Sequence, residues 1–154
     1  MSFQAKITEL GLELPPAPKA MGLYKSIVVV DKLCYLSGHG PLRPDGTLHL
    51  GKVGKDVDQE AGFQAARQTG LTMLATLQSH FGSLDKIKRL VKTLGLVNCT
   101  DDFDQQPAVI NGFSELMKQV FGDDAGVAAR SAVGTNALPF GMTVEVEAIF
   151  ELAD

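Results

Sequence analysis

The end of the chain has the clearest alternation of apolar and polar residues. Every second residue from Met142 to Leu152 is apolar, and Glu145, Glu147 and Glu151 lie between them. This period of two predicts a strand over 143–152 with one buried face. Shorter β-branched or apolar runs predict four more strands, over 27–30, 33–36, 87–97 and 130–136.

Two segments instead have apolar residues at steps of three and four, which is typical of amphipathic helices. The first helix is predicted to begin after Asp58 as its N-cap and to end near His80. The second is predicted over 104–121, with Gly122 as its C-cap. The order β-β-α-β-α-β-β indicates an α+β fold, in which a mixed sheet carries two helices on one face. Apolar groups around Ile149 on the other face favour self-association.

A chain of 154 residues fits one domain. Three prolines within 13–19 exclude a helix or a central strand there. We therefore expect residues 1–20 to form an extended N-terminal arm and residues 21–154 a single domain. Five glycines and two prolines within 37–54 predict a loop, which is a candidate for a site loop.

Composition narrows the classes of function. No apolar run reaches the length of a membrane span, and no secretory signal opens the chain, so we expect a soluble cytoplasmic protein without membrane contact. The net charge is −4 without a basic stripe, which argues against nucleic acid as a partner. The three histidines lack further ligands at metal spacing, so no metal is expected.

Arg130 is the most informative single residue. It begins a predicted strand among small and apolar residues, and its guanidinium keeps its charge, so it needs a partner. A bound carboxylate would suit the planar guanidinium, as in a site for amino or keto acids. An internal salt bridge to Glu145 or Asp124 is the alternative, and it is the more common reason for such an arginine.

Each of the other candidate site residues also has two interpretations. Glu145 shares a strand face with Glu147 and is either solvated or, in a closed pocket, able to activate a water. Tyr24 is either a ligand-binding phenol or an ordinary edge aromatic. The glycines around His39 could offer backbone N–H groups to an anion, and His39 itself is either an acid/base or polar surface.

The chain resembles the reactive intermediate deaminase family, also called the RidA or YjgF-like family and "endoribonuclease L-PSP". The resemblance covers nearly the whole domain. Its most specific part is the final block, Arg130-Ser131-Ala132-Val133, Leu138-Pro139 and Val144-Glu145-Val146-Glu147. It implies a chorismate-mutase-like fold and a homotrimer with clefts between neighbouring subunits.

The resemblance also implies a reaction, the hydrolysis of enamine and imine acids to the 2-keto acid and ammonia without a cofactor. Arg130, beside Ser131, would bind the substrate carboxylate, and Glu145 would position the attacking water. Tyr24 would line the pocket from the adjacent chain, and the backbone of Gly38 would approach the ligand. The partner would be a small carboxylate-bearing imine, enamine or keto acid.

The sequence also departs from the family pattern. Ala132 stands where a cysteine is frequent, Asn111 is not matched in spacing, and segments 42–55 and 121–129 are longer. These differences indicate a divergent subgroup. Two alternatives therefore stay open: a protein that binds or senses small carboxylates without turnover, and an RNA-cleaving or translation-inhibiting protein.

Overall fold

The computed structural model describes residues 2–154 and contains a five-stranded sheet in the order β1-β2-β5-β3-β4. The strands are β1 (Ile27–Val30), β2 (Leu33–His39), β3 (Ile87–Asn98), β4 (Ala129–Thr135) and β5 (Val144–Leu152). Strands β3 and β4 pair in parallel, and the other neighbours pair antiparallel. The mixed sheet and the α+β class are as the sequence predicts. β2 continues three residues further than predicted, through His39.

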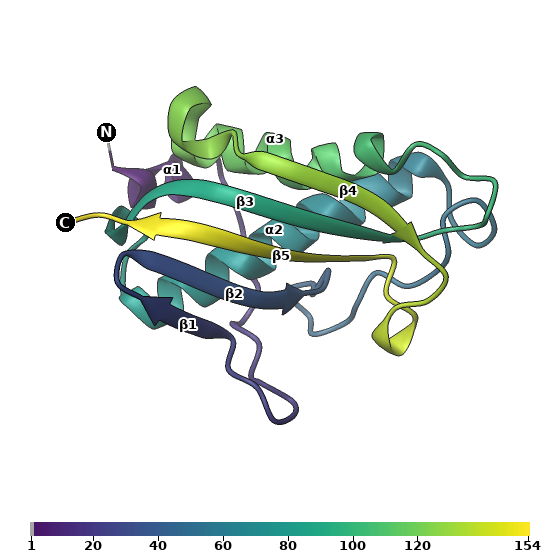
Figure 1. Cartoon of the computed structure of the whole chain (residues 1–154), viewed down its shortest axis with the longest axis horizontal. Coiled ribbons are helices and arrows are strands. Elements are labelled where there is room, and N and C mark those ends of the chain that lie inside the picture. Colours follow the sequence, from purple (N-terminus) through teal and green to yellow (C-terminus); the bar gives the residue numbers. More distant parts are fainter. Residues whose placement is uncertain (1) are drawn as a thin grey trace.

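Two long helices, α2 (Gln59–Phe81) and α3 (Gln106–Gly126), lie on one face of this sheet (Figure 1). Asp58 caps α2 as predicted, since its carboxylate accepts a hydrogen bond from the Ala61 N–H at 2.8 Å. Gly122 has a φ of 85° and interrupts α3, but four further residues form one more helical turn. The predicted C-cap is therefore a kink inside α3 rather than its end.

The core lies between the helices and the sheet. The predicted inner face of β5 is buried, and its side chains pack with those of both helices, namely Val144, Val146, Ala148 and Phe150 with Met73, Leu74, Phe113 and Leu116. Burial of each large side chain contributes about 1.5–3 kcal/mol. This packing fixes the register of β5, and with it the outward direction of Glu145 and Glu147.

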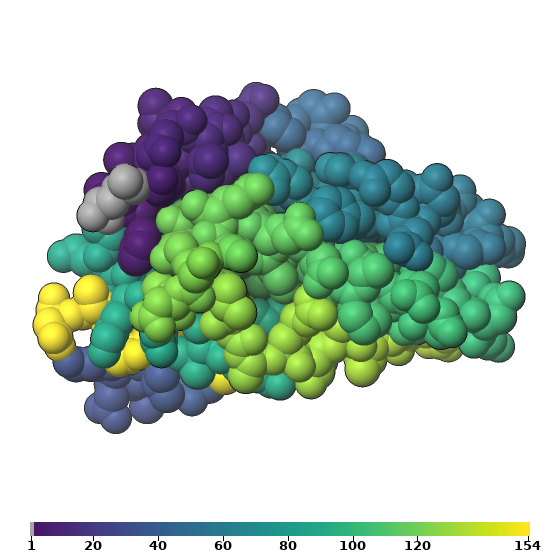
Figure 2. All heavy atoms as spheres, turned by 90° about the horizontal axis from the view of Figure 1, so that it is seen from above, coloured from purple at the N-terminus to yellow at the C-terminus, as the bar shows by residue number. Residues whose placement is uncertain are grey.

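The N-terminal segment differs from the predicted extended arm. Residues Phe3–Glu9 form a helix, α1, which Ser2 caps by accepting a hydrogen bond from the Ala5 N–H. Ile7 is buried, and the Phe3 ring meets Phe121 of α3 edge-on at a centroid distance of 5.0 Å. Figure 2 shows this segment in purple against the green atoms of α3. Residues 12–21 have no regular helix or strand.

In the part of the chain that the structure describes, the opposite face of the sheet carries no helix. Val28 pairs with Tyr35, and Tyr35 with Ile149, in a row of apolar residues across three strands. Val28 is 47% exposed and Tyr35 is 41% exposed.

Two short 3-10 turns, Leu84–Lys86 and Pro139–Gly141, complete the regular structure. Within residues 2–154, no helix combines the length and hydrophobicity needed to cross a membrane.

Candidate active site

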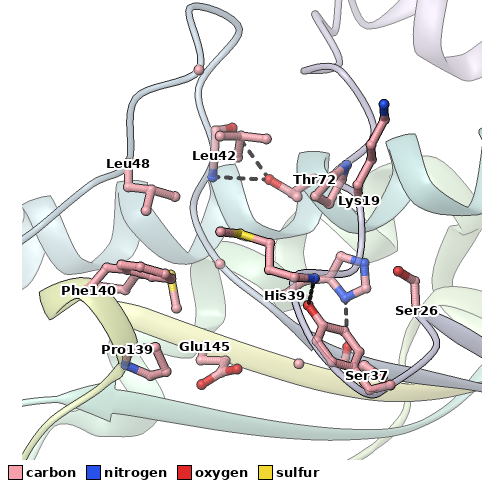
Figure 3. A pocket seen from close by; sticks show the side chains of 17 residues that line it. Lys19, Ser26, Ser37, His39, Leu42, Leu48, Thr72, Pro139, Phe140 and Glu145 are labelled. Carbon is pink, nitrogen blue, oxygen red and sulfur yellow. Dashed lines mark hydrogen bonds between the residues drawn. The ribbon is translucent and has the colours of Figure 1, made fainter.

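A cavity of about 680 Å³ opens beside the end of β2 (Figure 3). Its walls come from segments far apart in the sequence: the chain before β1, the loop after β2, the 3-10 turn 139–141 and the start of β5. Three of the predicted site residues, Tyr24, Gly38 and Glu145, line it together. The loop around residues 40–48, predicted as a candidate site loop, forms one wall.

A β-bulge turns Gly38 toward Glu145. Leu36 pairs with Ala148 and His39 with Val146, so two residues of β2 face one residue of β5. A Cβ atom on Gly38 would lie closer than 3.0 Å to the Glu145 carboxylate. Glycine at this position therefore makes room for the Glu145 side chain.

Glu145 is a half-buried carboxyl group. Within residues 2–154 the structure shows no hydrogen bond or ion pair to it. Burial raises its pKa, and the negative charge of Glu147 on the same strand face raises it further. A carboxyl group in this state is suited to exchanging a proton with a water or a ligand in the cavity.

Tyr24 lies at the mouth of the cavity and is 50% exposed. Its phenol oxygen accepts a hydrogen bond from the Met21 N–H at 3.1 Å, which fixes the ring. The phenol O–H remains free to donate to a bound molecule.

His39 is neither polar surface nor an acid/base, because it is buried and both ring nitrogens are bonded internally. Its Nδ1 lies 2.6 Å from the Ser37 carbonyl oxygen, and its Nε2 lies 2.9 Å from Thr76 Oγ1 on α2. The carbonyl can only accept, so Nδ1 carries the hydrogen. Burial lowers the pKa of His39, and the bond to Ser37 partly opposes this. The neutral imidazole holds the bulge against α2.

Arg130 lies away from this cavity, on β4 at the opposite edge of the sheet. Its Nη1 donates to Asn111 Oδ1 at 2.8 Å and to Ser114 Oγ at 3.2 Å, both on α3. The expected internal salt bridge is absent within residues 2–154: Asp124 pairs with Arg89 at 2.7 Å instead. The guanidinium is thus oriented by neutral groups, and its charge is not compensated by a carboxylate there.

Ser131 is separated from Arg130 because neighbouring residues of a strand point to opposite faces. Its Oγ accepts a hydrogen bond from Lys92 Nζ at 3.3 Å on the open face of the sheet. The single chain therefore presents two separate half-sites. The carboxyl half-site consists of Tyr24, Gly38 and Glu145, and the arginine half-site consists of Arg130, Asn111 and Ser114.

Two further residues of the candidate site were not predicted from the sequence. Ser114 follows Asn111 by three residues and so shares its helix face, a spacing that could have indicated a common partner. Phe140 lines the cavity, is 71% exposed, and has a φ of 59°, which is rare for an aromatic residue. Nothing in the local sequence predicts that conformation.

Comparisons with known proteins agree with this architecture. Residues 4–152 match the family model described as "YjgF/chorismate_mutase-like, putative endoribonuclease". The chain is 38% identical over 148 residues to Protein TCP17 of Trypanosoma cruzi, covering 96% of this chain and 92% of the relative. It is 31% identical to the human 2-iminobutanoate/2-iminopropanoate deaminase, covering 86% of this chain and 82% of that protein.

Among solved structures, Atu1372 of Agrobacterium tumefaciens, a protein of unknown function, superposes with a TM-score of 0.88. It is 35% identical, and the match covers 99% of this chain and 94% of that one. The sequence match and the superposition both span nearly the whole domain. This chain therefore belongs to the YjgF/chorismate mutase-like family.

Proposed function

We propose that the chain hydrolyses imine and enamine acids to 2-keto acids and ammonia, at clefts that are completed between copies of the chain. The observation that carries this proposal is the set of hydrogen-bond partners around the Arg130 guanidinium. It is fixed by two neutral acceptors and lacks an anionic partner within residues 2–154, as expected of a guanidinium that receives a substrate carboxylate. The human relative named a 2-iminobutanoate/2-iminopropanoate deaminase acts on such acids.

The two half-sites support assembly between chains. Arg130 lies on β4 at one sheet edge, whereas Gly38 lies on β2, with β5 and β3 between the two strands. The two half-sites of one molecule cannot both contact the same small acid. In a homotrimer closed by the open sheet faces, the arginine half-site of one subunit would meet the carboxyl half-site of its neighbour.

The chemistry follows from Glu145. Its carboxylate accepts a proton from a water whose oxygen attacks the imine carbon, and the C=N π electrons move to nitrogen, which takes up a proton. The C–N bond of this carbinolamine then breaks, and ammonia leaves as the hydroxyl proton is lost and the ketone forms. An enamine first takes a proton on carbon to become the imine. Water is the only co-reactant, and Glu145 carries the proton between steps.

RNA cleavage has less support as a function than imine hydrolysis. The open face carries Glu145 and Glu147 together with Glu151, which pairs with Lys88, and the chain has a net charge of −4. This charge would repel a phosphate backbone rather than neutralise it.

The test generates 2-aminoacrylate with a dehydratase and follows pyruvate formation with wild-type protein and Arg130→Ala. We expect acceleration by the wild type and loss of at least about a hundredfold in the variant, since a charge-assisted bidentate contact is removed. Arg67→Ala is the matched control, because Arg67 also donates to a neutral acceptor, Gln119 Oε1, and neither residue belongs to a half-site.

Folded wild-type protein that leaves the rate unchanged would contradict the hydrolase proposal. Calorimetry with pyruvate would then test whether the protein binds small carboxylates without turnover. Saturable binding that Arg130→Ala abolishes would support a carboxylate-binding protein without turnover.

A further inference from the structure

The hydroxyl group of Ser114 differs from other helical hydroxyls in what it bonds to. Its Oγ accepts a hydrogen bond from Arg130 Nη1 at 3.2 Å, and within residues 2–154 its own O–H has no acceptor. A helical hydroxyl often donates to the carbonyl four residues earlier. Thr69 of α2 does so, to Ala65 at 2.9 Å. Because Ser114 makes no such bond, its O–H remains available to an acceptor from outside the chain.

At one end of the Arg130 guanidinium the hydrogens are already used. Nη1 carries two hydrogens and has two acceptors, Asn111 Oδ1 at 2.8 Å and Ser114 Oγ at 3.2 Å. The N–H groups of Nε and Nη2 have no partner within residues 2–154. A carboxylate that approaches the Nη1–Nη2 pair would therefore find free N–H groups only on Nη2. The Ser114 O–H lies beside Nη1, where the second donor is missing.

The neighbouring residues of β4 do not offer such a donor. Ala132 is the next residue on the same face of the strand as Arg130, and its side chain is only a methyl group. Ser131 lies on the opposite face. Asn111, Ser114 and Arg130 are each half-buried, so hydrogen bonds to a ligand there are partly shielded from water and gain strength.

We infer that Ser114 is a binding residue of the arginine half-site, whose O–H donates to one oxygen of the ligand carboxylate while Arg130 Nη2 donates to the same carboxylate. The inference rests on the proposed function for the identity of the ligand. A hydroxyl has one hydrogen to donate and two lone pairs that accept. Ser114 can therefore accept from Nη1, which orients the guanidinium, and donate to the carboxylate at the same time.

Calorimetry with pyruvate, the product of the 2-aminoacrylate assay, tests this contact. We expect Ser114→Ala to weaken binding by about tenfold or more, because a hydrogen bond to a charged group is lost. Ser114→Thr retains the hydroxyl and should restore most of the affinity. Ser79→Ala is the matched control, because Ser79 is an exposed helical serine of α2 that belongs to neither half-site. Wild-type affinity in Ser114→Ala would overturn the inference.

A second pair of variants separates contact with the ligand from orientation of the guanidinium. Arg130→Lys keeps a cation, but the lysine ammonium has rotatable donors and no plane that Ser114 could orient. If Ser114 donates to the carboxylate, adding Ser114→Ala to Arg130→Lys still weakens pyruvate binding severalfold. An NMR titration to high pyruvate concentration measures these weaker affinities. Equal affinity with and without Ser114→Ala would show that Ser114 acts only through the guanidinium, and would overturn the inference.

Turnover of 2-aminoacrylate by the same variants separates this inference from the proposed hydrolysis. We expect kcat/KM of Ser114→Ala to fall by about as much as its affinity for pyruvate. Pyruvate binding that depends on Ser114, without turnover by the wild type, would refute the hydrolysis and keep the contact. Turnover with unchanged kcat/KM in Ser114→Ala would refute the contact and keep the hydrolysis. Folded wild-type protein that neither binds pyruvate nor turns over the imine would contradict both.

Discussion

At the residue scale, Gly38 and Glu145 approach each other closely in the site. Gly38→Ala would place a Cβ within 3.0 Å of the carboxylate, and the flexible Glu145 side chain would have to move. We expect turnover to fall by about a hundredfold, the usual cost of a misplacement of about 1 Å, while the melting temperature changes little. Steady-state kinetics and thermal unfolding measure the two effects.

Gly22→Ala is the control for this substitution. A Cβ there would lie 3.6 Å from the Tyr24 ring, which is an ordinary contact. Normal turnover by Gly38→Ala would show that Glu145 is not held in its working position by this approach.

A second residue-scale prediction concerns pH. If the Glu145 carboxylate is the base, kcat/KM falls as the pH drops through its pKa, and burial and Glu147 place this acid limb above the usual range for glutamate. Glu147→Gln removes one negative charge, so we expect the limb to move to lower pH. Because burial is the larger cause, the limb should stay above the ordinary value. A pH–rate profile of both proteins measures the shift, and an unmoved or raised limb would contradict it.

The role or position of a single residue could be predicted from the sequence where the chemistry of its side chain allows few alternatives. The permanent charge of Arg130 requires a partner, and the period of two places Glu145 on the outer face of β5. Partners that arise from tertiary packing could not be predicted. Thr76 bonds His39 across 37 positions, and Ser114 and Asn111 reach Arg130 only because α3 lies over β4.

At the element scale, the contact between α2 and α3 depends on Gly112. A Cβ there would come closer than 3.0 Å to the backbone carbonyl of Phe63, and a backbone atom cannot move away as a side chain can. We expect Gly112→Ala to lower the free energy of unfolding by at least about 2 kcal/mol, although alanine is the better helix former. Urea denaturation measures this loss.

Gly62→Ala on α2 is the matched helical control. Its Cβ would meet only side chains of Val53 and Val109, at 3.1–3.3 Å, so the loss should be smaller. Equal stability of the two variants would show that the helices are free to separate. Since α3 also carries Asn111 and Ser114, Gly112→Ala should raise KM as well.

The long elements could be predicted because their apolar periodicity persists over many residues. α1 could not be, although Ser2 at its N-cap and the four-residue step from Phe3 to Ile7 were visible signals. A helix of seven residues is unstable alone, and here it is stabilised by contacts with Phe121 and by the bond from Ser2 to Asp85. Those contacts depend on residues more than 80 positions away.

At the scale of the whole molecule, a site shared between copies predicts complementation. Arg130→Ala and Glu145→Gln are each expected to be inactive alone. If both are denatured, mixed and refolded together, some clefts will combine an intact Glu145 with an intact Arg130, and activity should return to a measurable fraction of wild type. Turnover per mole of subunit before and after mixing provides the measurement.

Size-exclusion chromatography with light scattering gives the mass of the mixed species, for which we expect a trimer. A refolded mixture of wild-type mass without activity would place both residues of each site in one chain. The fold class follows from the order of elements, whereas the number of subunits depends on how the open sheet faces meet and is not encoded in that order.

The position of β5 has a consequence for the route by which the chain reaches its native state. β5 is the last strand in chain order, yet it lies between β2 and β3. Leu33 pairs with Glu151 across most of the chain, so closure of the sheet carries a large entropic cost and slows folding. On the ribosome, the helices can form early, but the apolar face of α2 that packs on β5 stays uncovered until the final strand emerges. During that interval the nascent chain exposes the edges of β2 and β3, and chaperone capture would compete with sheet closure there.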